Sequence, residues 1–477
     1  MKSHVLFLIL VSVSLTTYAN INYTVDNFIN DVTEKNAKKS VLSSKNKVSE
    51  YQLEQALGIT DWQINTSVFD SHHEPFDKSS FTASYINTIG TFLGIDRPIR
   101  STGGDLSFGL TQERISQPEV VYNGLAFNTP LYYQTILGIQ YRQPILYGFG
   151  GEIYNFTIDN AQVEKDKTML QSTEEFEYFL QEELYEFINW TLLNELTELS
   201  FSRLQLAKES LDQTKERVRV NLSEKIDLLR AEYAFKTSLQ HWQTKKAQLK
   251  SAQYKIAAKF DDLSIRQKTP VFDLYDYEYV KKPSYIIVKN LRSVQMINLS
   301  EPILQKQVQL SESKRNGSLD IIGGFDFLGG ADAFNSSLNL DQNNARIALQ
   351  YSRDLSDTQS IAKLKETKED LLQFELERDQ IITNLESEII ALYTLINEYQ
   401  EILNVNLSQI NTSQEKAAAE EALFKQGRSS IDMLIEAQDN VLYSKSHYAQ
   451  IAAEYQKFTI TYLALIDELL SKYKVSL

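Results

Sequence analysis

Two stretches of this chain lack proline and glycine over lengths that few folds can accommodate. The first runs from residue 152 to about 219 and the second from residue 358 to about 426. Apolar side chains recur every three or four positions in the first stretch, which is the spacing that lines one face of a helix. Each stretch predicts one continuous helix, about 100 Å long at 1.5 Å per residue. Ordinary globular helices average only about 11–12 residues.

Each long helix is followed by a break and a second helical run, at about 225–260 and about 431–470. Each half of the chain therefore predicts an antiparallel helical hairpin. A shift of 206 residues aligns the two hairpin ends without a gap, so that Asn221 falls on Gly427. Asparagine and glycine are the residues that most readily take the left-handed backbone angles of a tight turn. The chain is predicted to contain two copies of one structural unit.

Segments that alternate apolar and polar residues precede the long helices in both halves. They lie at about 61–70, 134–143, 318–328 and 345–353, with a further one at 105–113. Such alternation predicts strands with one apolar and one polar face. A soluble, half-buried sheet explains the alternation as well, whereas the long helices favour a sheet in lipid. The residues predicted to face lipid are Trp62, Leu137, Ile139, Tyr141, Leu349 and Tyr351.

The chain turns from strand to long helix at "QPILYGFGG", residues 143–151. Pro144 has no N–H to donate, so we expect it to end the strand ladder. Gly148, Gly150 and Gly151 then allow backbone angles that other residues avoid. The corresponding corner in the second half, "YSRDLSD", contains neither proline nor glycine, and the sequence does not explain how it turns.

These elements define the expected organisation. Residues 1–19 resemble a secretory signal, with a basic start, an apolar run and a small-x-Ala site. The first repeat, 20–260, begins with a leading helix, and residues 71–104 and 114–131 are predicted to be loops of an extracellular insert. Residues 261–284 form an irregular connector. The second repeat, 285–477, begins with a helix at about 285–313.

Composition excludes several classes of function. The chain has 477 residues, a net charge of -15 and no cysteine, so disulfides and thiolate metal sites are absent, and the acidic balance argues against nucleic-acid binding. No apolar run after the signal is long enough for a transmembrane helix. The adjacent His72 and His73 point apart on a strand and predict no metal site. We find no catalytic constellation and expect neither a cofactor nor an enzyme.

Strand number constrains how such a chain could enter a membrane. Single-chain membrane β-barrels begin at eight strands, and unpaired strand edges are costly in lipid. Four or five strands per chain therefore require several chains to share one barrel. Because two strands per half return the chain to its starting side and three do not, we place segment 105–113 in the extracellular loop region.

At this point the sequence resembles the TolC-type outer-membrane efflux protein family, over most of the mature chain. "QPILYGFGG" is similar to the strand-to-helix corner of that family, and "LFKQGRSSIDMLIEAQ", residues 423–438, is similar to its hairpin-tip motif. The resemblance implies a homotrimer with four strands per chain, a twelve-stranded β-barrel in the outer membrane and a periplasmic α-helical barrel. It also implies a passive exit duct that works with a periplasmic adaptor and an energised inner-membrane transporter.

The resemblance also implies that contacts at the hairpin tips hold the tube closed. By position, the tip residues are Asn221, Asp227, Gly427, Arg428 and Asp432. Solvated turn charges are an equal alternative, because exposed ion pairs contribute only about 0–1 kcal/mol. Two other functions stay open: a periplasmic adaptor with a helical hairpin, and an exported enzyme with coiled-coil decoration. The sequence specifies neither the exported substrate nor the pump type. Asp320 and Asp326 on the polar faces predict a mild cation preference.

Overall fold

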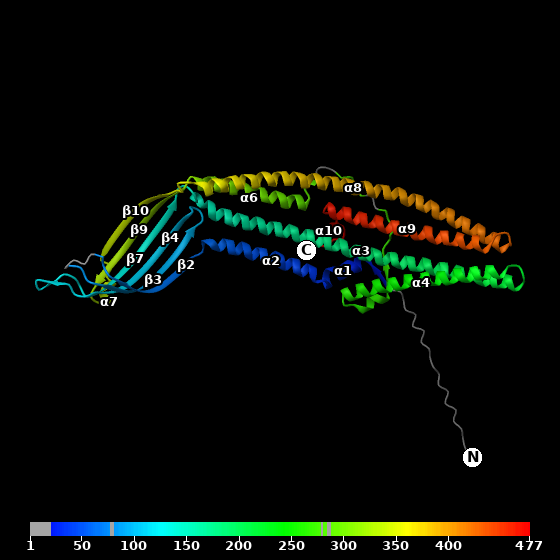
Figure 1. Cartoon of the computed structure of the whole chain (residues 1–477), viewed down its shortest axis with the longest axis horizontal. Coiled ribbons are helices and arrows are strands. Elements are labelled where there is room, and N and C mark those ends of the chain that lie inside the picture. Colours follow the sequence, from blue (N-terminus) through cyan, green and yellow to red (C-terminus); the bar gives the residue numbers. More distant parts are fainter. Residues whose placement is uncertain (1–20, 77–80, 278–279, 284–287) are drawn as a thin grey trace, which may run out of the picture. The chain divides into compact units, whose positions relative to one another are not determined.

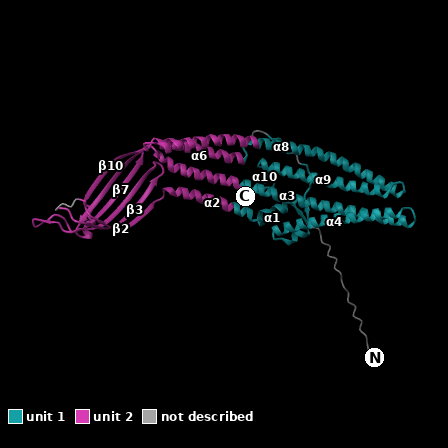
Figure 2. Ribbon diagram, viewed as in Figure 1, with its two compact units in different colours: residues 1–42, 173–291, 385–477 teal, residues 43–172, 292–384 magenta. Residues whose placement is uncertain are grey.

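The structure of the protein is a computed structural model that describes residues 21–76, 81–277, 280–283 and 288–477. The predicted signal, residues 1–19, lies outside the described residues. The chain divides into two compact units, shown in Figure 2. Unit 1 comprises Met1–Leu42, Thr173–Leu291 and Leu385–Leu477, and unit 2 comprises Ser43–Ser172 and Arg292–Asn384. Each unit takes segments from both halves of the chain.

The four predicted hairpin helices are present and match in length between the halves (Figure 1). Helices α3, Glu152–Arg219, and α8, Thr358–Lys425, each have 68 residues. Helices α4, Lys225–Lys259, and α9, Ile431–Leu465, each have 35 residues. The duplicated helix–turn–helix pattern is confirmed, although α9 ends earlier than expected. Asp467, with φ +61°, separates it from the short helix α10, Leu469–Lys472.

The core of unit 1 forms around the middle of α3. Phe176, Leu180, Leu184 and Phe187 recur at helical spacing on one face of α3 and are fully buried. Phe28 stacks on Phe187 with ring centroids 4.8 Å apart. Burying an apolar side chain of this size stabilises the fold by about 1.5–3 kcal/mol, so this stripe anchors the long helix within unit 1.

The N-terminal segment differs from the single leading helix that the sequence predicted. It contains strand β1, Ile21–Thr24, helix α1, Val25–Lys35, and helix α2, Ala37–Leu57. Asn36 is extended, at φ -90° and ψ 138°, and interrupts the helix. β1 pairs in parallel with β8, Lys268–Val271, which follows the 3-10 turn η3, Leu263–Gln267. The connector is therefore tied to the N-terminal segment by a two-stranded sheet.

Unit 2 contains an antiparallel sheet of six strands in the order β10-β9-β7-β4-β3-β2. Their bounds are β2 Gln63–His73, β3 Ile86–Ile99, β4 Gly104–Ser116, β7 Leu131–Pro144, β9 Ser318–Ala331 and β10 Gln342–Ser352. Unit 2 also contains helix α6, Arg292–Arg315, which includes Pro302, and the short helix α7, Phe334–Ser337. Its turns are η1, Gly58–Thr60, and η2, Phe149–Gly151, and its two-residue strands are β5, Val121–Tyr122, and β6, Leu125–Ala126.

Two strands lie where the sequence predicted loops. Segment 105–113 is not part of a loop: it lies in β4, paired with β7 along its length. The region 71–104, also expected to be a loop, contains β3. Gly90, Gly94 and Pro98 concealed that strand, because these residues are depleted in ordinary strands. The first half therefore supplies four strands to the sheet and the second half two, an even number in each half. No helix among the described residues is apolar enough over a sufficient length to span a bilayer.

Candidate functional site

The six-stranded sheet has one apolar face that the described protein leaves uncovered. Directly opposed residues share a face, and the register aligns Leu93 with Leu110, Leu110 with Leu137, and Leu137 with Phe327. The pattern continues to both edge strands, where Val68 is 77% exposed and Ile347 is 88% exposed. An uncovered apolar surface across six strands is larger than soluble monomers usually show and is typical of a membrane or protein interface.

The residues predicted to face lipid take different positions. Leu137, Ile139 and Tyr141 of β7 lie on the apolar face, as do Leu349 and Tyr351 of β10. The Tyr141 hydroxyl donates to Gln143 Oε1 at 2.6 Å and lies 2.9 Å from Thr102 Oγ1. Trp62 stands just before β2 rather than in it, with the Arg97 guanidinium 5.2 Å from its ring centroid.

The opposite face of the sheet is polar and carries linked charges. Arg142 Nε lies 3.3 Å from Asp320 Oδ1, and its Nη1 lies 3.6 Å from Asp105 Oδ2. Arg346 Nη1 lies 3.5 Å from Asp326 Oδ2, and its Nη2 donates to Gln140 at 3.0 Å. Two arginines thus accompany the two aspartates that the sequence singled out.

At the first strand-to-helix corner, Pro144 is the last residue of β7 and all three predicted glycines have positive φ. A Cβ on Gly151 would lie 1.7 Å from the Arg100 carbonyl oxygen, so the β3–β4 turn packs directly against the corner. Gly150 N donates to the Thr102 carbonyl at 3.1 Å and fixes that approach. The corner therefore turns the chain and also fixes the position of the β3–β4 hairpin.

The second corner turns through Asp357, which sequence reasoning missed. Asp357 takes φ +48° immediately before α8. Its Oδ2 lies 3.5 Å from Arg315 Nε and 3.5 Å from Arg353 Nη2. Aspartate tolerates left-handed angles better than most residues, and the two arginines compensate its burial.

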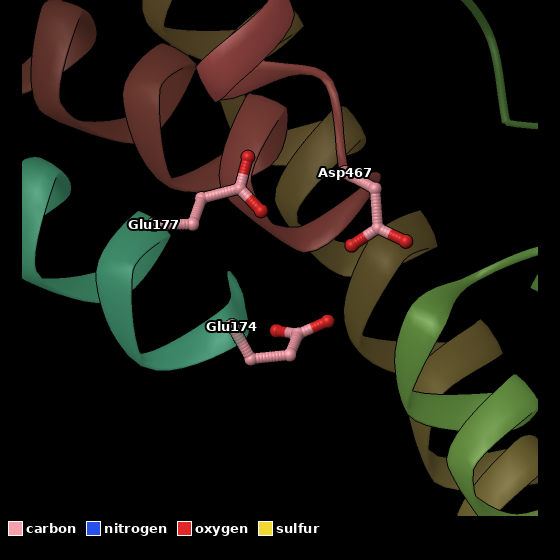
Figure 3. A group of neighbouring side chains, drawn as sticks. All are labelled: Glu174, Glu177 and Asp467. Carbon is pink, nitrogen blue, oxygen red and sulfur yellow. The ribbon is translucent and has the colours of Figure 1, made fainter. Parts of the chain in front are cut away.

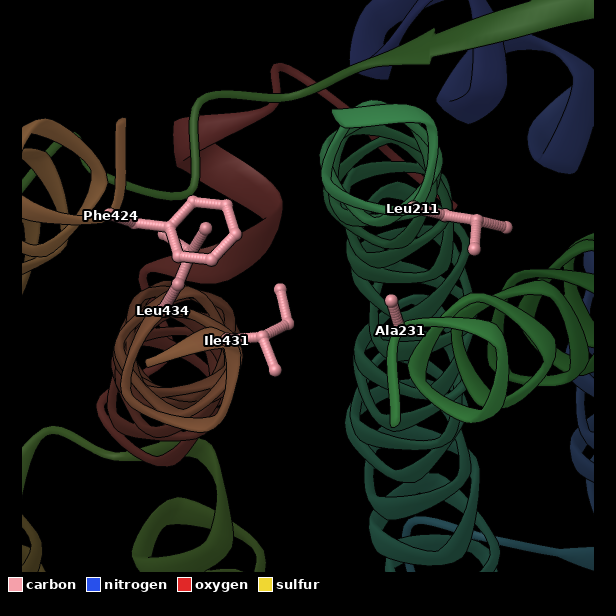
Figure 4. Close-up of a cluster of buried hydrophobic side chains, with 5 residues drawn as sticks. All are labelled: Leu211, Ala231, Phe424, Ile431 and Leu434. Carbon is pink, nitrogen blue, oxygen red and sulfur yellow. The ribbon is translucent and has the colours of Figure 1, made fainter. Parts of the chain in front are cut away.

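The ends of the two hairpins meet around a small apolar cluster (Figure 4). Its members come from all four hairpin helices: Leu211 of α3, Ala231 of α4, Phe424 of α8, and Ile431 and Leu434 of α9. At the two turns, Asn221 takes φ +60° and Gly427 takes φ +76°, as the repeat predicted. The cluster joins the two hairpins to each other at this end of unit 1.

Arg230 bridges the acidic residues of the two hairpin ends. Its Nη1 lies 3.0 Å from Asp432 Oδ2 on α9 and 3.6 Å from Asp227 Oδ1 on its own helix. Asp227 also accepts from Glu224 N at 3.1 Å and caps α4. Arg428 is exposed and its guanidinium contacts Gln426 of the same turn at 3.5 Å. The structure therefore brings Asp227 and Asp432 together through Arg230 and not through Arg428.

A second arginine also crosses between the hairpins. Arg217 near the end of α3 donates from Nη1 to the Phe424 carbonyl at 2.7 Å and places its guanidinium 4.8 Å from the Phe424 ring centroid. Further from the turn, the buried Arg203 of α3 donates to Asp439 Oδ1 of α9 at 2.8 Å. We define the tip contacts as these three arginines, Arg203, Arg217 and Arg230, with their partners.

Comparisons with known proteins bear on the fold. No family model matches the sequence, and no curated protein matches it in sequence. Among solved structures, CusC, described for transmembrane channel formation, is 12% identical with a TM-score of 0.68 over 94% of this chain and 95% of that one. The outer membrane protein VceC from Vibrio cholerae is 10% identical, with a TM-score of 0.64 over 93% and 95%. The CmeC outer membrane channel of Campylobacter jejuni is 10% identical, with a TM-score of 0.66 over 93% and 85%.

The chain has the fold of the TolC-type outer-membrane channels. The likeness shows the fold at this level of identity, and it confirms the resemblance drawn from the two motifs. Within the TolC-type fold, Arg230 carried a sequence signal that was overlooked. It stands three residues after Asp227 on α4, which is the spacing of neighbours on a helix surface.

Unit 1 also contains a cluster of three acidic side chains (Figure 3). Glu174 and Glu177 of α3 and Asp467 bring carboxylate oxygens within 4.8 Å of one another. Glu177 Oε1 accepts from the backbone N of Leu470 at 3.1 Å. This bond ties the C-terminal turn to α3, so the position of Glu177 has a structural explanation that requires no ion.

Proposed function

We propose that this chain is one subunit of a passive, homotrimeric outer-membrane exit duct that extends into the periplasm. Small molecules or proteins would leave through it, delivered by an energised inner-membrane transporter and a periplasmic adaptor. The carrying observation is the uncovered apolar face across all six strands, since a bilayer is the environment that covers such a face without further protein. The polar face, with its linked charges, then lines the water-filled side.

The second part of the proposal concerns a gate at the ends of the helical hairpins. We infer that the tip contacts hold the periplasmic end closed, because they tie the α3–α4 hairpin to the α8–α9 hairpin. The Arg230–Asp432 pair is exposed and contributes about 0–1 kcal/mol, whereas Arg203 is buried. A partner that binds the open arrangement of the tips more tightly than the closed one can shift the gate towards opening. We therefore propose that the adaptor binds at this end.

The decisive experiment is membrane fractionation followed by reconstitution. We expect the full chain in the outer-membrane fraction as a heat-labile trimer, and we expect purified protein to conduct ions in planar bilayers. The adaptor alternative predicts a protein without conductance, and it requires partners for the apolar sheet face other than lipid. A monomer in the soluble periplasmic fraction would overturn the proposal.

A further inference from the structure

The sheet contains a hairpin that has no helix attached to it. Four strands connect directly to helices: β2 follows α2, β7 precedes α3, β9 follows α6, and β10 precedes α8. Strands β3 and β4 are inserted between β2 and β7 and join no helix. They are nevertheless fully laddered, β3 with β2 and β4, and β4 with β7. The insert therefore lies inside the sheet, where it separates β2 from β7.

The inserted hairpin is locked in place at its helix-proximal turn. Thr102 lies in that turn, and its carbonyl accepts from Gly150 N at 3.1 Å and from Gln143 Nε2 at 2.8 Å. A Cβ on Gly103 would lie 2.0 Å from the Gly148 carbonyl oxygen. Such close backbone approach requires glycine at position 103 of the turn. The turn and the strand-to-helix corner fit each other, so β3 and β4 form a permanent part of the sheet.

The two edges of the sheet are open and suited to each other. β2 and β10 have 11 residues each, and every residue of β10 is exposed. Because the six strands alternate in direction, the two edge strands are antiparallel to one another. The apolar face continues to both edges, with Ile64 and Val68 on one and Ile347 and Leu349 on the other. In lipid each unpaired backbone group would cost several kcal/mol.

From these observations we propose that β2 of one copy pairs with β10 of the next, so that each chain contributes six strands to the membrane wall. This inference rests on the proposed function. Three copies then close a wall of eighteen strands, in place of the twelve that the family resemblance implies. Circumference scales with strand number at a fixed spacing of about 4.8 Å, so the wall is about 1.5 times wider than one of twelve strands. The partner of each sheet edge is a second copy of this chain.

Disulfide cross-linking of the full chain in outer membranes tests the pairing, and the natural absence of cysteine makes the background clean. Thr66→Cys on β2 is combined in turn with Ala345→Cys, Ile347→Cys and Leu349→Cys on β10, all on the apolar face. Facing residues on paired strands have Cβ atoms about 4.5–5.5 Å apart, close enough to bridge after small shifts. We expect one of these pairs to give linked dimers and trimers on oxidation.

Two controls decide between the alternatives. Thr66→Cys with Ala348→Cys, on the opposite face, should stay unlinked. Leu110→Cys on β4, combined with the same β10 series, tests a four-stranded contribution that leaves β2 and β3 outside the wall. Links from Leu110 and none from Thr66 would overturn this inference, but they would be compatible with the proposed function as an exit duct. A chain that gives no intermolecular link in either series and fractionates as a soluble monomer would overturn both.

A deletion variant gives an independent readout. Removing residues 86–116 joins Tyr85 to Gln117 and leaves β2 and β7 free to pair as antiparallel neighbours. We expect end-on projection images of the purified trimer to show a membrane wall about 1.5 times wider for the full chain than for the variant. Equal widths would contradict a six-stranded contribution. If the variant does not assemble, the cross-linking series on the full chain still decides the question.

Discussion

At the residue scale, Arg230 is the side chain that joins acidic residues of both hairpin ends. Arg230→Ala removes the contact to Asp432 and is expected to raise the leak conductance of the reconstituted trimer. A loss of up to about 1 kcal/mol per chain shifts the open-to-closed ratio about fivefold, and about a hundredfold if three equivalent contacts must break together. Single-channel recording at low voltage measures the change.

Arg428→Ala is the matched control for Arg230→Ala. Arg428 belongs to the same tip, but its guanidinium contacts Gln426 of its own turn instead of the other hairpin. Its removal should leave the closed state as it is in the natural protein. Equal leak in both variants would show that loss of tip charge in general, rather than the bridge through Arg230, governs closure.

Substitutions at two neighbouring glycines allow the cost of a positive φ to be measured separately from the cost of a close backbone contact. Gly150 and Gly151 both have positive φ, yet a Cβ on Gly150 meets no atom within 4 Å, while one on Gly151 lies 1.7 Å from the Arg100 carbonyl oxygen. Gly150→Ala should therefore lower stability by about 1–2 kcal/mol. Gly151→Ala should cost more than about 3 kcal/mol, because backbone must move. The fraction of trimer that survives a heating series measures both, and similar losses would contradict the close approach.

Single residues were the least predictable part of the candidate site. The turn residues Asn221 and Gly427 followed from the repeat, because a left-handed angle is a local property of the residue. Arg230 could not be placed from the tip motif, since its role depends on how the second hairpin sits beside the first. The role of Asp357 depends on Arg315, which precedes β9 and lies beside it only in the folded chain.

At the element scale, the second corner depends on Asp357 for both its backbone angle and its charge. Asp357→Asn keeps a residue that tolerates φ +48° but removes the pairs with Arg315 and Arg353. Asp357→Ala loses the charge and adds strain of about 1–2 kcal/mol. We expect Asn to destabilise the trimer modestly and Ala by that additional amount. Heat resistance of the trimer compares them, and equal losses would assign the whole effect to charge.

Helix α3 carries a carboxyl group whose ionisation opposes folding. Burial raises the pKa of Glu195, although the hydrogen bond from Tyr275 lowers it. The folded state then binds this proton more tightly than the unfolded state. The contribution of Glu195 to stability is therefore greatest at low pH and falls as pH rises through the interval between the two pKa values. Glu195→Gln should raise stability at neutral pH and flatten this dependence.

Glu198→Gln serves as the comparison for Glu195→Gln, because Glu198 is one turn away on α3 and exposed. Thermal unfolding in detergent, followed by helical circular dichroism at pH 5 and pH 7.5, separates the two variants. A stabilisation by Glu198→Gln equal to that by Glu195→Gln would indicate a general relief of negative charge on a chain of net charge -15.

The two longest helices were predictable to within a few residues, and strands only in part. The bounds of α3 and α8 followed from unbroken helical spacing, which is a property of the segment itself. β3 was hidden by Gly90, Gly94 and Pro98, and it forms because β2 and β4 supply partners on both sides. Without β3, segment 105–113 would have been a third strand in the first half, and three strands do not return the chain to its starting side. The segment was therefore predicted to be a loop. One missed strand therefore produced two errors.

At the scale of the whole molecule, the polar face of the sheet sets the charge along the proposed duct. Its register gathers five acidic residues and two basic ones, a net charge of -3 per chain: Asp96, Asp105, Glu113, Asp320 and Asp326 against Arg142 and Arg346. We therefore still predict a mild preference for cations. We attribute it mainly to Asp96 and Glu113, because Asp105, Asp320 and Asp326 lie beside arginines.

The reversal potential of the reconstituted trimer in a potassium chloride gradient tests this charge balance. The natural protein should prefer cations mildly, and Arg346→Gln should strengthen the preference, because it changes the net charge of the face from -3 to -4 per chain. Glu113→Gln should weaken it. The double variant Asp326→Asn with Arg346→Gln removes one charge of each sign and should behave as the natural protein does. Anion preference in the natural protein, or a double variant that shifts as far as Arg346→Gln alone, would show that ions are selected elsewhere, with the helical tip as the next position to test.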